Sequence, residues 1–347
     1  MEMNNKETRR VVIGITAHVD AGKTTLAEAM LYRTGQLRKL GRVDHGSAAM
    51  DSHLLERERG ITIFLSQAEL PLGDMEVTLL DTPGHVDFSA EMERTLSVLD
   101  YAILVISGVD GVQAHTRTLW RLLELYRVPT FLFVTKMDFG RRDRDCLMES
   151  LRHELGEGCV DFTPAARDRR MEQLATCRED ALEAYLDTGM VPEELVRQLV
   201  RQRLVFPCWF GSGLKLEGID EFLEGLARYV EPPVYPETFS ARVFKISHDA
   251  QGKRLTHLKV TGGTLRVRDA ISYGGRQEKA AQLRIYTGGR FRPVDQVPAG
   301  GICAVQGLTA TWGGQGLGER EEAVRPVLEP VMHYRMALPP DCDSRVL

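Results

Sequence analysis

The chain has 347 residues, of which 43% are hydrophobic and 27% are charged, with 44 Lys and Arg against 49 Asp and Glu. This length predicts two domains, and the composition is that of an ordinary soluble globular protein. The net charge of −5 excludes a chain-wide surface for polyanions. No apolar run approaches the roughly 20 residues that a membrane span needs.

The first residues and the cysteines indicate the compartment. Residues 1–9 are polar and lack the apolar core of a signal peptide, so we expect a short disordered tail there. The six cysteines form no C-x-x-C pair and no convincing His/Cys ligand cluster, which favours reduced thiols and argues against a zinc site. These features predict a cytoplasmic protein that does not contact a membrane.

The segment Ala17–Thr25 follows an apolar run, Val11–Ile15, and precedes a helical run. Strand, tight loop and helix in this order form the context in which a P-loop binds phosphate. Backbone N–H groups would face a polyphosphate, Lys23 would reach its β- and γ-phosphates, and Thr24 would offer a hydroxyl to Mg²⁺. Ala17 stands where the pattern usually has Gly. The alternative interpretation is an ordinary glycine-containing turn.

A polar segment over residues 34–60 leads into the tripeptide Gly60-Ile61-Thr62. A Thr in such a loop can offer a hydroxyl to Mg²⁺ and a backbone N–H to a γ-phosphate. Taken alone, Thr62 is better interpreted as a residue that starts the next strand. The local sequence leaves both alternatives open.

Asp81 ends the strand that is predicted over Val77–Leu80 and opens the segment Asp81-Thr82-Pro83-Gly84-His85. Ligands of doubly wound folds bind at the carboxyl ends of the strands. Asp81 can therefore hold Mg²⁺ through water, Gly84 lets the backbone approach a γ-phosphate, and His85 then lies near an attacking water. A D-x-x-G pattern alone is weak, but it is strong when it comes about 60 residues after a P-loop.

Buried strands are predicted at residues 101–106 and 130–134, which indicates a parallel α/β sheet. The second strand leads into Thr135-Lys136-Met137-Asp138. Asp138 can accept from the N1–H and 2-amino groups of guanine, and adenine offers no such pair of donors; the stem of Lys136 would cover one face of the base. Thr135 replaces the Asn of the N-K-x-D pattern, and its hydroxyl could still tie this loop to the P-loop. The alternative is a charged surface turn.

The next motif follows an insertion over residues 139–210, in which helical runs are predicted near residues 170–186 and from residue 191 onward. A last apolar strand is predicted over residues 205–210, where the insertion ends, and a loop of small residues follows it. The backbone N–H groups of that loop could bind the guanine O6, and they belong to Ser212, Gly213 and Leu214.

A helix over residues 219–230 and a stiff, proline-rich linker over residues 231–236 mark a domain boundary. Beyond it, short strand-like runs alternate with Gly-Gly turns, which predicts a small antiparallel β-barrel. The strand-like runs cover residues 241–246, 255–260, 264–267, 270–273, 280–286 and 301–305.

The expected fold is α/β, with a doubly wound, mostly parallel P-loop sheet and a helical insert, followed by a small antiparallel β-barrel. The expected domains are a nucleotide-binding domain over residues 10–231, with its insert at 139–210, and a barrel over residues 238–325. Residues 326–347 would start a further domain.

Together these motifs resemble the translational GTPases over nearly the whole chain, from Arg10 to about Pro330. The similarity is nearest to the elongation factor G branch and, within it, to the tetracycline-resistance ribosomal protection proteins. The phrases that carry it are AHVDAGKTT (17–25), LLERERGITI (54–63), DTPGHVDF (81–88), SVLDYAILVISGVDGVQAHTR (97–117), TKMD (135–138), GSGLK (211–215), VFKI (243–246) and GGTLRVRD (262–269).

This resemblance implies that GTP is the substrate, GDP the product and Mg²⁺ the metal, with a monovalent cation such as K⁺ near Asp20. The implied metal ligands are Thr24, Thr62 and Asp81, and the implied catalytic residues are His85, Asp20, Thr62 and Lys23. The implied GTP-binding residues are His18, Val19, Asp20, Ala21, Gly22, Lys23, Thr24, Thr25, Thr62, Asp81, Gly84, Thr135, Lys136, Asp138, Ser212, Gly213 and Leu214.

The resemblance further implies a translation factor that is monomeric off the ribosome and whose partners are ribosomal RNA and ribosomal proteins. The motifs contain no obvious arginine finger, so we expect slow GTP hydrolysis that ribosomes accelerate. Family members carry further domains, so we expect this chain to be an N-terminal fragment. The alternatives are a housekeeping translocase, a release-type factor, a GTP/GDP-sensing module with little catalysis, and a P-loop ATPase.

Overall fold

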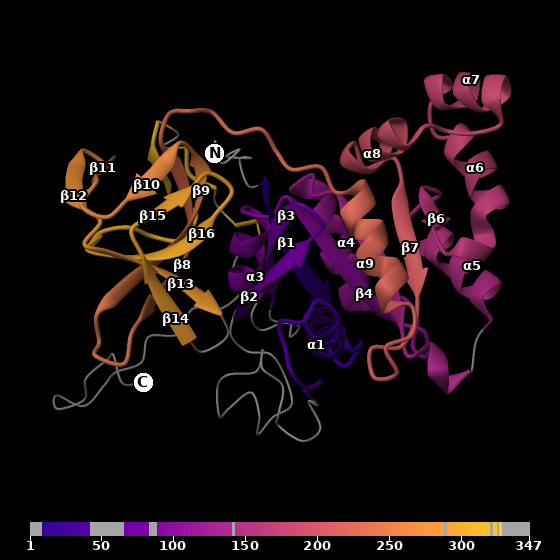
Figure 1. Cartoon of the computed structure of the whole chain (residues 1–347), viewed down its shortest axis with the longest axis horizontal. Helices are drawn as coiled ribbons and strands as arrows, with labels where there is room; N and C mark the ends of the chain where they lie inside the picture. The colour runs from indigo at the N-terminus through magenta and orange to yellow at the C-terminus, as the bar shows by residue number, and fades with distance from the viewer. Residues whose placement is uncertain are drawn as a thin grey trace, which may run out of the picture.

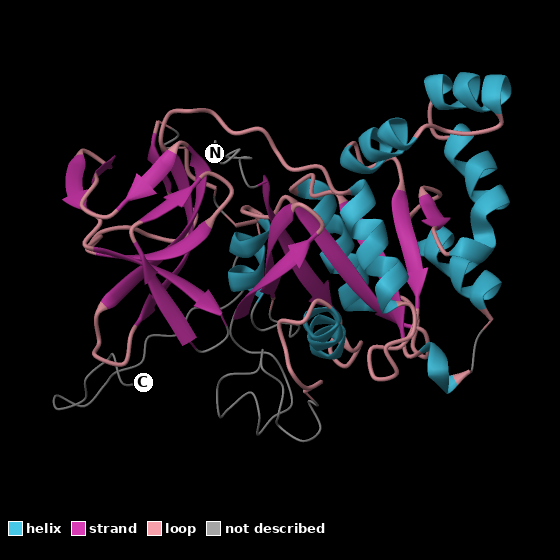
Figure 2. Ribbon diagram, viewed as in Figure 1, coloured by secondary structure: helices cyan, strands magenta, loops and turns pink. Residues whose placement is uncertain are grey.

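The computed structural model describes residues 9–41, 66–82, 89–140, 143–287, 290–319, 322–324 and 326–327. Two bodies follow each other along the chain (Figure 1): an α/β domain, whose sheet contains β1 to β7, and a β domain, which contains β8 to β17. Figure 2 shows that the helices of the described residues lie in the first body. The predicted succession of an α/β sheet and antiparallel strands is confirmed.

The α/β domain is organised around a sheet of strand order β2-β3-β1-β4-β5-β7-β6. All neighbouring pairs are parallel except β2 and β3. The inner strands are almost wholly apolar because helices cover both faces of the sheet. The strands are β1 (Arg9–Ala17), β2 (Ser66–Leu72), β3 (Met75–Asp81), β4 (Tyr101–Ser107), β5 (Thr130–Thr135), β6 (Cys159–Asp161) and β7 (Phe206–Phe210).

Two groups of helices enclose this sheet. On one face, α1 (Lys23–Arg33) and α9 (Ile219–Tyr229) contribute apolar side chains to the larger core. On the other face, α3 (Ser89–Leu96), α4 (Ala114–Leu125) and α5 (Arg144–Leu155) form a second core with the sheet. The carboxyl ends of the parallel strands are left to the loops, which is where this fold class binds ligands.

The insertion differs from the expectation in two respects. The single helical run that we expected near residues 170–186 is two helices, α6 (Arg167–Ala175) and α7 (Glu179–Thr188), because the chain turns between them. The insertion also adds strand β6 to the edge of the main sheet, beside β7. Its last helix is α8 (Glu193–Arg201).

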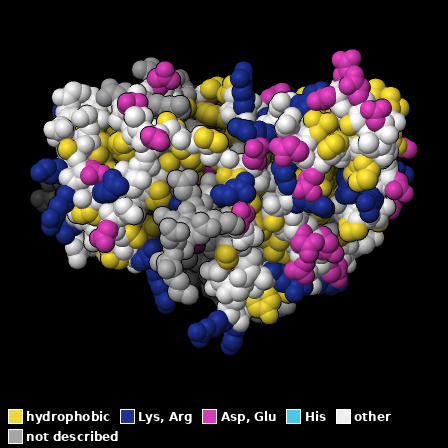
Figure 3. Space-filling view, turned by 45° about the horizontal axis from the view of Figure 1, so that its top comes forward, with side chains coloured by type: hydrophobic (Ala, Val, Ile, Leu, Met, Phe, Trp, Pro, Cys, Tyr) yellow, Lys and Arg dark blue, Asp and Glu magenta, His cyan; other side chains and the backbone are white. Residues whose placement is uncertain are grey.

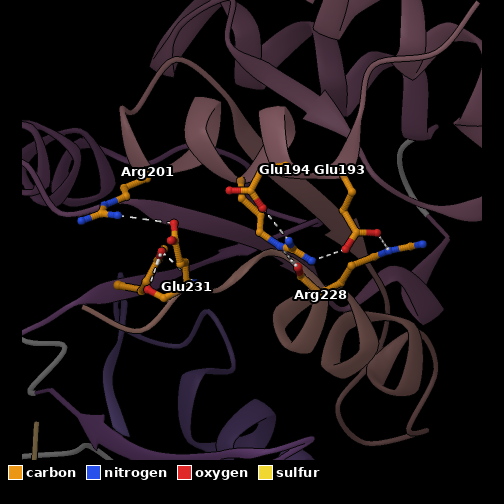
Figure 4. A network of polar contacts seen from close by, with 7 residues as sticks. Glu193, Glu194, Arg201, Arg228 and Glu231 are labelled. Carbon is orange, nitrogen blue, oxygen red and sulfur yellow. Dashed lines mark hydrogen bonds and ion pairs between the residues drawn. The ribbon is translucent and has the colours of Figure 1, made fainter. Parts of the chain in front are cut away.

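Ion pairs connect α8 to the end of the α/β domain, as Figure 4 shows. Glu193 bonds to Arg228 of α9, and Arg201 Nη1 lies 3.4 Å from a carboxylate oxygen of Glu231. Glu194 receives a bond of 2.9 Å from the guanidinium of Arg197 within the helix. The Glu193–Arg228 pair thus joins α8 to α9, and the Arg201–Glu231 pair joins α8 to the chain just after α9.

The β domain contains a six-stranded antiparallel sheet of order β14-β13-β16-β9-β8-β17 and two small ribbons, β10-β15 and β11-β12. Every predicted strand-like run corresponds to a strand, and four strands were not predicted: β12, β14, β15 and β17. The bounds are β8 (Ser240–His248), β9 (Arg254–Gly262), β10 (Thr264–Arg266), β11 (Ala270–Tyr273), β12 (Arg276–Lys279), β13 (Gln282–Thr287), β14 (Arg290–Val294), β15 (Gln296–Pro298), β16 (Ile302–Gln306) and β17 (Gly316–Gly318).

A buried ion pair joins the two domains. Lys259 Nζ of β9 lies 2.6 Å from a carboxylate oxygen of Asp100, and the two side chains are only 4% and 9% exposed. Asp100 also accepts from the Val12 N–H at 2.8 Å and from the Tyr235 hydroxyl at 3.3 Å. Burial and the Asp100 charge raise the pKa of Tyr235. An apolar cluster drawn from both domains contains Val12, Leu80, Val98, Phe244 and Ile302.

The β domain is basic, and part of its charge contacts the α/β domain. Residues 238–319 carry 12 Lys and Arg against 5 Asp and Glu, and Figure 3 shows a group of these cations at the left rim of the molecule. Lys245 Nζ lies 2.9 Å from Glu91 of α3, and Arg292 lies 2.8 Å from Glu69 of β2. Complementary charge therefore helps to fix the orientation of the two bodies.

Within the described residues, no helix combines the length and the apolar character that a membrane crossing requires.

Candidate functional site

The loop between β1 and α1 has the geometry of an anion cradle. Gly22 precedes α1 with a φ of 89°, and Asp20 has a φ of 61°. Glycine adopts this left-handed conformation without penalty and Asp tolerates it. The Ala21 N–H donates to His18 O at 3.2 Å, which closes a tight turn before the helix. The N-terminus of α1 therefore opens on a compact loop, the arrangement that attracts a phosphate group.

A buried charge pair lies directly beside this loop. Lys23, the first residue of α1, bonds through Nζ to Asp81, and the two side chains are 7% and 0% exposed. Asp81 is the last residue of β3, and the parallel register places it next to Ile15 of β1. Thr24 is also buried. The first turn of α1 and the end of β3 thus bring an ammonium, a carboxylate and a hydroxyl to one point of the sheet edge.

The loop after β5 carries a carboxylate with free acceptor capacity. Lys136 has a φ of 60°, and the short helix η3 (Met137–Phe139) begins immediately after it. The Asp138 side chain is 12% exposed, and its Oδ2 lies 3.8 Å from Lys215 Nζ. Its Oδ1 is buried and has no hydrogen-bond partner in the part of the chain that the structure describes. Because an unsatisfied buried oxygen is costly, this atom is suited to accept a bond from a ligand.

Thr135 connects the two halves of the site. Its hydroxyl donates to the backbone oxygen of Ala21 in the phosphate loop and also lies 3.2 Å from Ile106 O. This contact confirms the expectation that the Thr hydroxyl ties the loop after β5 to the P-loop. A methyl group added at Gly22 would lie 3.5 Å from Thr135 Oγ1, so the two loops pack closely.

The loop after β7 closes the same edge. The Met137 N–H donates to Gly211 O at 3.2 Å, and Ser212 exchanges backbone bonds with Glu217. Gly213 approaches α1 so closely that an added Cβ would lie 3.1 Å from the backbone oxygen of Thr25. Only a residue without a side chain allows this loop to lie against the phosphate-loop helix without displacement.

The structure therefore brings most of the predicted site residues to the carboxyl ends of β1, β3, β5 and β7, to the loops that follow these strands and to the first turn of α1. The residues placed there are His18, Val19, Asp20, Ala21, Gly22, Lys23, Thr24, Thr25, Asp81, Thr135, Lys136, Asp138, Ser212, Gly213 and Leu214. Three predicted residues, Thr62, Gly84 and His85, lie outside the described residues.

One neighbour of the site was not predicted. His115 of α4 is buried, and its ring centroid lies 6.1 Å from that of His18 in the phosphate loop. His115 falls within the phrase at residues 97–117 that carries the family resemblance, but the packing of α4 beside the P-loop is what brings its ring near His18.

Family models match most of the chain. Residues 8–232 match the model described as elongation factor Tu GTP binding domain, and residues 238–317 match elongation factor G domain 2. The chain is also similar to a protein of Thermus thermophilus of known crystal structure. That likeness has a TM-score of 0.81 at 26% identity and covers 91% of this chain and 55% of the other.

Two curated relatives show the same similarity. The oxytetracycline resistance protein of Streptomyces rimosus is 39% identical over an alignment of 334 residues, and the match covers 85% of this chain and 50% of the relative. The tetracycline resistance protein TetP of Clostridium perfringens is 32% identical over an alignment of 346 residues, and the match covers 91% of this chain and 52% of the relative. The chain thus spans about half the length of the curated relatives it matches. It belongs to the translational GTPase family defined by the elongation factor Tu GTP-binding domain and, through its second domain, to the elongation factor G branch.

Proposed function

We propose that this chain binds and hydrolyses GTP as part of a translation factor that acts on the ribosome. The observation that carries the proposal is the pairing of two chemistries at one sheet edge. A phosphate loop with Lys23 lies at one end, and a buried carboxylate oxygen of Asp138 that has no partner among the described residues lies at the other. Thr135 holds the two ends together.

The base would be recognised by the loops after β5 and β7. Asp138 accepts from the N1–H and the 2-amino group of guanine, which adenine cannot offer as a pair. The stem of Lys136 covers one face of the base. The backbone of Lys136 is left-handed, and its side chain starts directly before η3. Backbone N–H groups of the second loop, at Ser212, Gly213 and Leu214, are the proposed donors to O6.

The phosphate end fits a magnesium nucleotide by the chemistry of its donors. Hydroxyl and carboxylate oxygens are the ligands that Mg²⁺ accepts, and Thr24 and Asp81 supply them, with Thr62 as the proposed third residue. When bound, Mg²⁺ neutralises charge on the phosphates. Lys23 now bonds to Asp81, so we infer that Lys23 turns to the phosphates when a nucleotide enters and frees the carboxylate.

The hydrolytic step needs a positioned water and little else from the protein. We assign the orientation of that water to His85, the closure over the γ-phosphate to Thr62, and the backbone contact at the second switch to Gly84. Asp20, which is exposed at the rim of the phosphate loop, would hold a monovalent cation such as K⁺. Lys23 stabilises the charge that develops on the transferred phosphoryl group.

The whole factor is proposed to be a cytoplasmic ribosomal protection protein or an elongation factor G-like protein. The relatives named for tetracycline and oxytetracycline resistance support the first possibility. We propose that residues 10–231, with the insert 139–210, form the GTP-binding domain, that residues 238–325 form the barrel and that residues 326–347 begin another domain. Ribosomal RNA and ribosomal proteins are the proposed partners of a factor that is monomeric off the ribosome.

Calorimetry of the full chain with magnesium tests the nucleotide site. We expect GTP and GDP to bind and ATP to fail to compete, because Asp138 is left without a matching pair of donors. Binding of neither guanine nucleotide would refute the proposal, and equal competition by ATP would favour a P-loop ATPase.

The variant His85→Ala tests catalysis. We expect slow hydrolysis by the chain alone, stimulation by ribosomes, and loss of that stimulation in the variant. A variant that binds GTP normally and is stimulated as strongly as the parent chain would show that His85 is not catalytic. Binding without any turnover would favour a GTP/GDP-sensing module.

A further inference from the structure

The side chain that joins the two halves of the site has little left to offer a ligand. Thr135 is 3% exposed and ends strand β5. Its hydroxyl oxygen has two close polar neighbours, Ala21 O and Ile106 O. Both neighbours are backbone carbonyl oxygens, which accept hydrogen bonds and cannot donate them.

A hydroxyl group has a single proton. Since both neighbours of Thr135 Oγ1 can only accept, that proton is committed to a carbonyl, and Ala21 O is the nearer of the two. What remains on the oxygen is acceptor capacity. The Thr135 side chain can therefore donate to a nucleotide only if it releases the phosphate loop.

The guanine atoms N7 and O6 are both acceptors. A side chain whose proton is already used makes no bond to either atom. We propose that Thr135 leaves guanine N7 without a donor: Asp138 selects the base through N1–H and the 2-amino group, O6 is left to the backbone donors of the loop after β7, and guanine nucleotides altered at ring position 7 are accepted. This inference rests on the proposed GTP-binding function and specifies its base selectivity.

The test is competition binding to the full chain with magnesium, using GDP, 7-deaza-GDP and inosine diphosphate. In 7-deaza-GDP a C–H replaces N7 and leaves the shape and the other edge unchanged; inosine diphosphate lacks the 2-amino donor. We expect 7-deaza-GDP to bind within about twofold of GDP. Inosine diphosphate should bind about 5- to 140-fold more weakly, which corresponds to the 1–3 kcal/mol of a bidentate base contact.

Two variants of Thr135 provide the matched controls. Thr135→Asn brings two N–H donors, one for Ala21 O and one for the base, so GDP should become preferred over 7-deaza-GDP by at least about fivefold. Thr135→Val keeps the shape of the side chain and removes the hydroxyl, so the affinities for GDP and for 7-deaza-GDP should fall by the same factor. A purely structural role of Thr135 would leave the ratio of the two affinities unchanged in every variant.

A parent chain that binds GDP tightly but 7-deaza-GDP tenfold or more weakly would overturn this inference and leave the proposed function intact. A ratio that stays unchanged in Thr135→Asn would also overturn it, because residue 135 would then not set the selectivity. Failure of GDP itself to bind would overturn the proposed function together with the inference.

Discussion

The buried ion pair between the two domains allows a stability prediction. Replacing Lys259 with Met leaves Asp100, which is 9% exposed, without its cation and leaves Val98 O without the 3.0 Å bond from Nζ. Removing one partner of a buried pair costs about 3–5 kcal/mol. Asp100 keeps its bonds from Val12 N–H and the Tyr235 hydroxyl, so we expect the lower end, about 3 kcal/mol.

Urea unfolding followed by far-UV circular dichroism measures this loss, with the m-values of parent and variant compared. The matched control is Lys245→Met, which breaks an interdomain pair with Glu91 whose side chains are 17% and 26% exposed. Because that pair is closer to solvent, its loss should cost about 1 kcal/mol or less.

A double-mutant cycle separates the ion pair from general effects of each substitution. The double variant Lys259→Met with Asp100→Asn removes both charges, so it should be more stable than the sum of the single losses predicts, by about 1.5 kcal/mol or more. The reasoning is wrong if Lys259→Met costs no more than Lys245→Met, or if the cycle gives no coupling.

Three further predictions concern other sites. Burial and the nearby Lys245 charge lower the pKa of His257 to about 3, so only the unfolded chain takes up this proton below about pH 6.5 and stability falls as the pH drops towards 3. His257→Gln should reduce that slope, by up to about 1.4 kcal/mol per pH unit in unfolding titrations. The guanidinium of Arg203 lies 5.2 Å from the Trp120 ring centroid, and Arg203→Lys should cost about 1–2 kcal/mol by denaturation, whereas an unchanged midpoint would contradict a stacking role. Asp138→Asn should weaken the binding of GDP at least about 100-fold in calorimetry and should make xanthosine diphosphate the preferred nucleotide. A variant that still prefers GDP would exclude base recognition by this carboxylate.

Local sequence was sufficient for the phosphate loop and the buried strands. An apolar run followed by a glycine and a Lys-Thr pair that starts a helix predicts a tight turn between a strand and a helix. Gly22 adopts the positive φ that such a turn requires. The inner strands were predictable because both their faces are covered, so their sequences are almost wholly apolar.

The edge strands were not predictable in the same way. Strand β2, Ser66–Leu72, begins with two polar residues and contains Pro71, and β12, Arg276–Lys279, is entirely polar. Such segments become strands because a partner supplies the hydrogen bonds, as β3 does for β2 and β11 for β12. Strand β6, Cys159–Asp161, was not predictable for the same reason, since this three-residue segment becomes a strand by pairing with β7.

The sequence by itself determined which chemical groups this protein carries and the order in which they occur, since the phosphate loop and the guanine-type motif are each formed by a few consecutive residues. Only the tertiary structure decided which groups meet. Lys23 and Asp81 are 58 residues apart, Ala21 and Thr135 are 114 apart, and Asp100 and Lys259 are 159 apart. Their contacts depend on strand order and on the docking of the β domain, and these follow from burial of apolar surface across the whole chain, which no local pattern records.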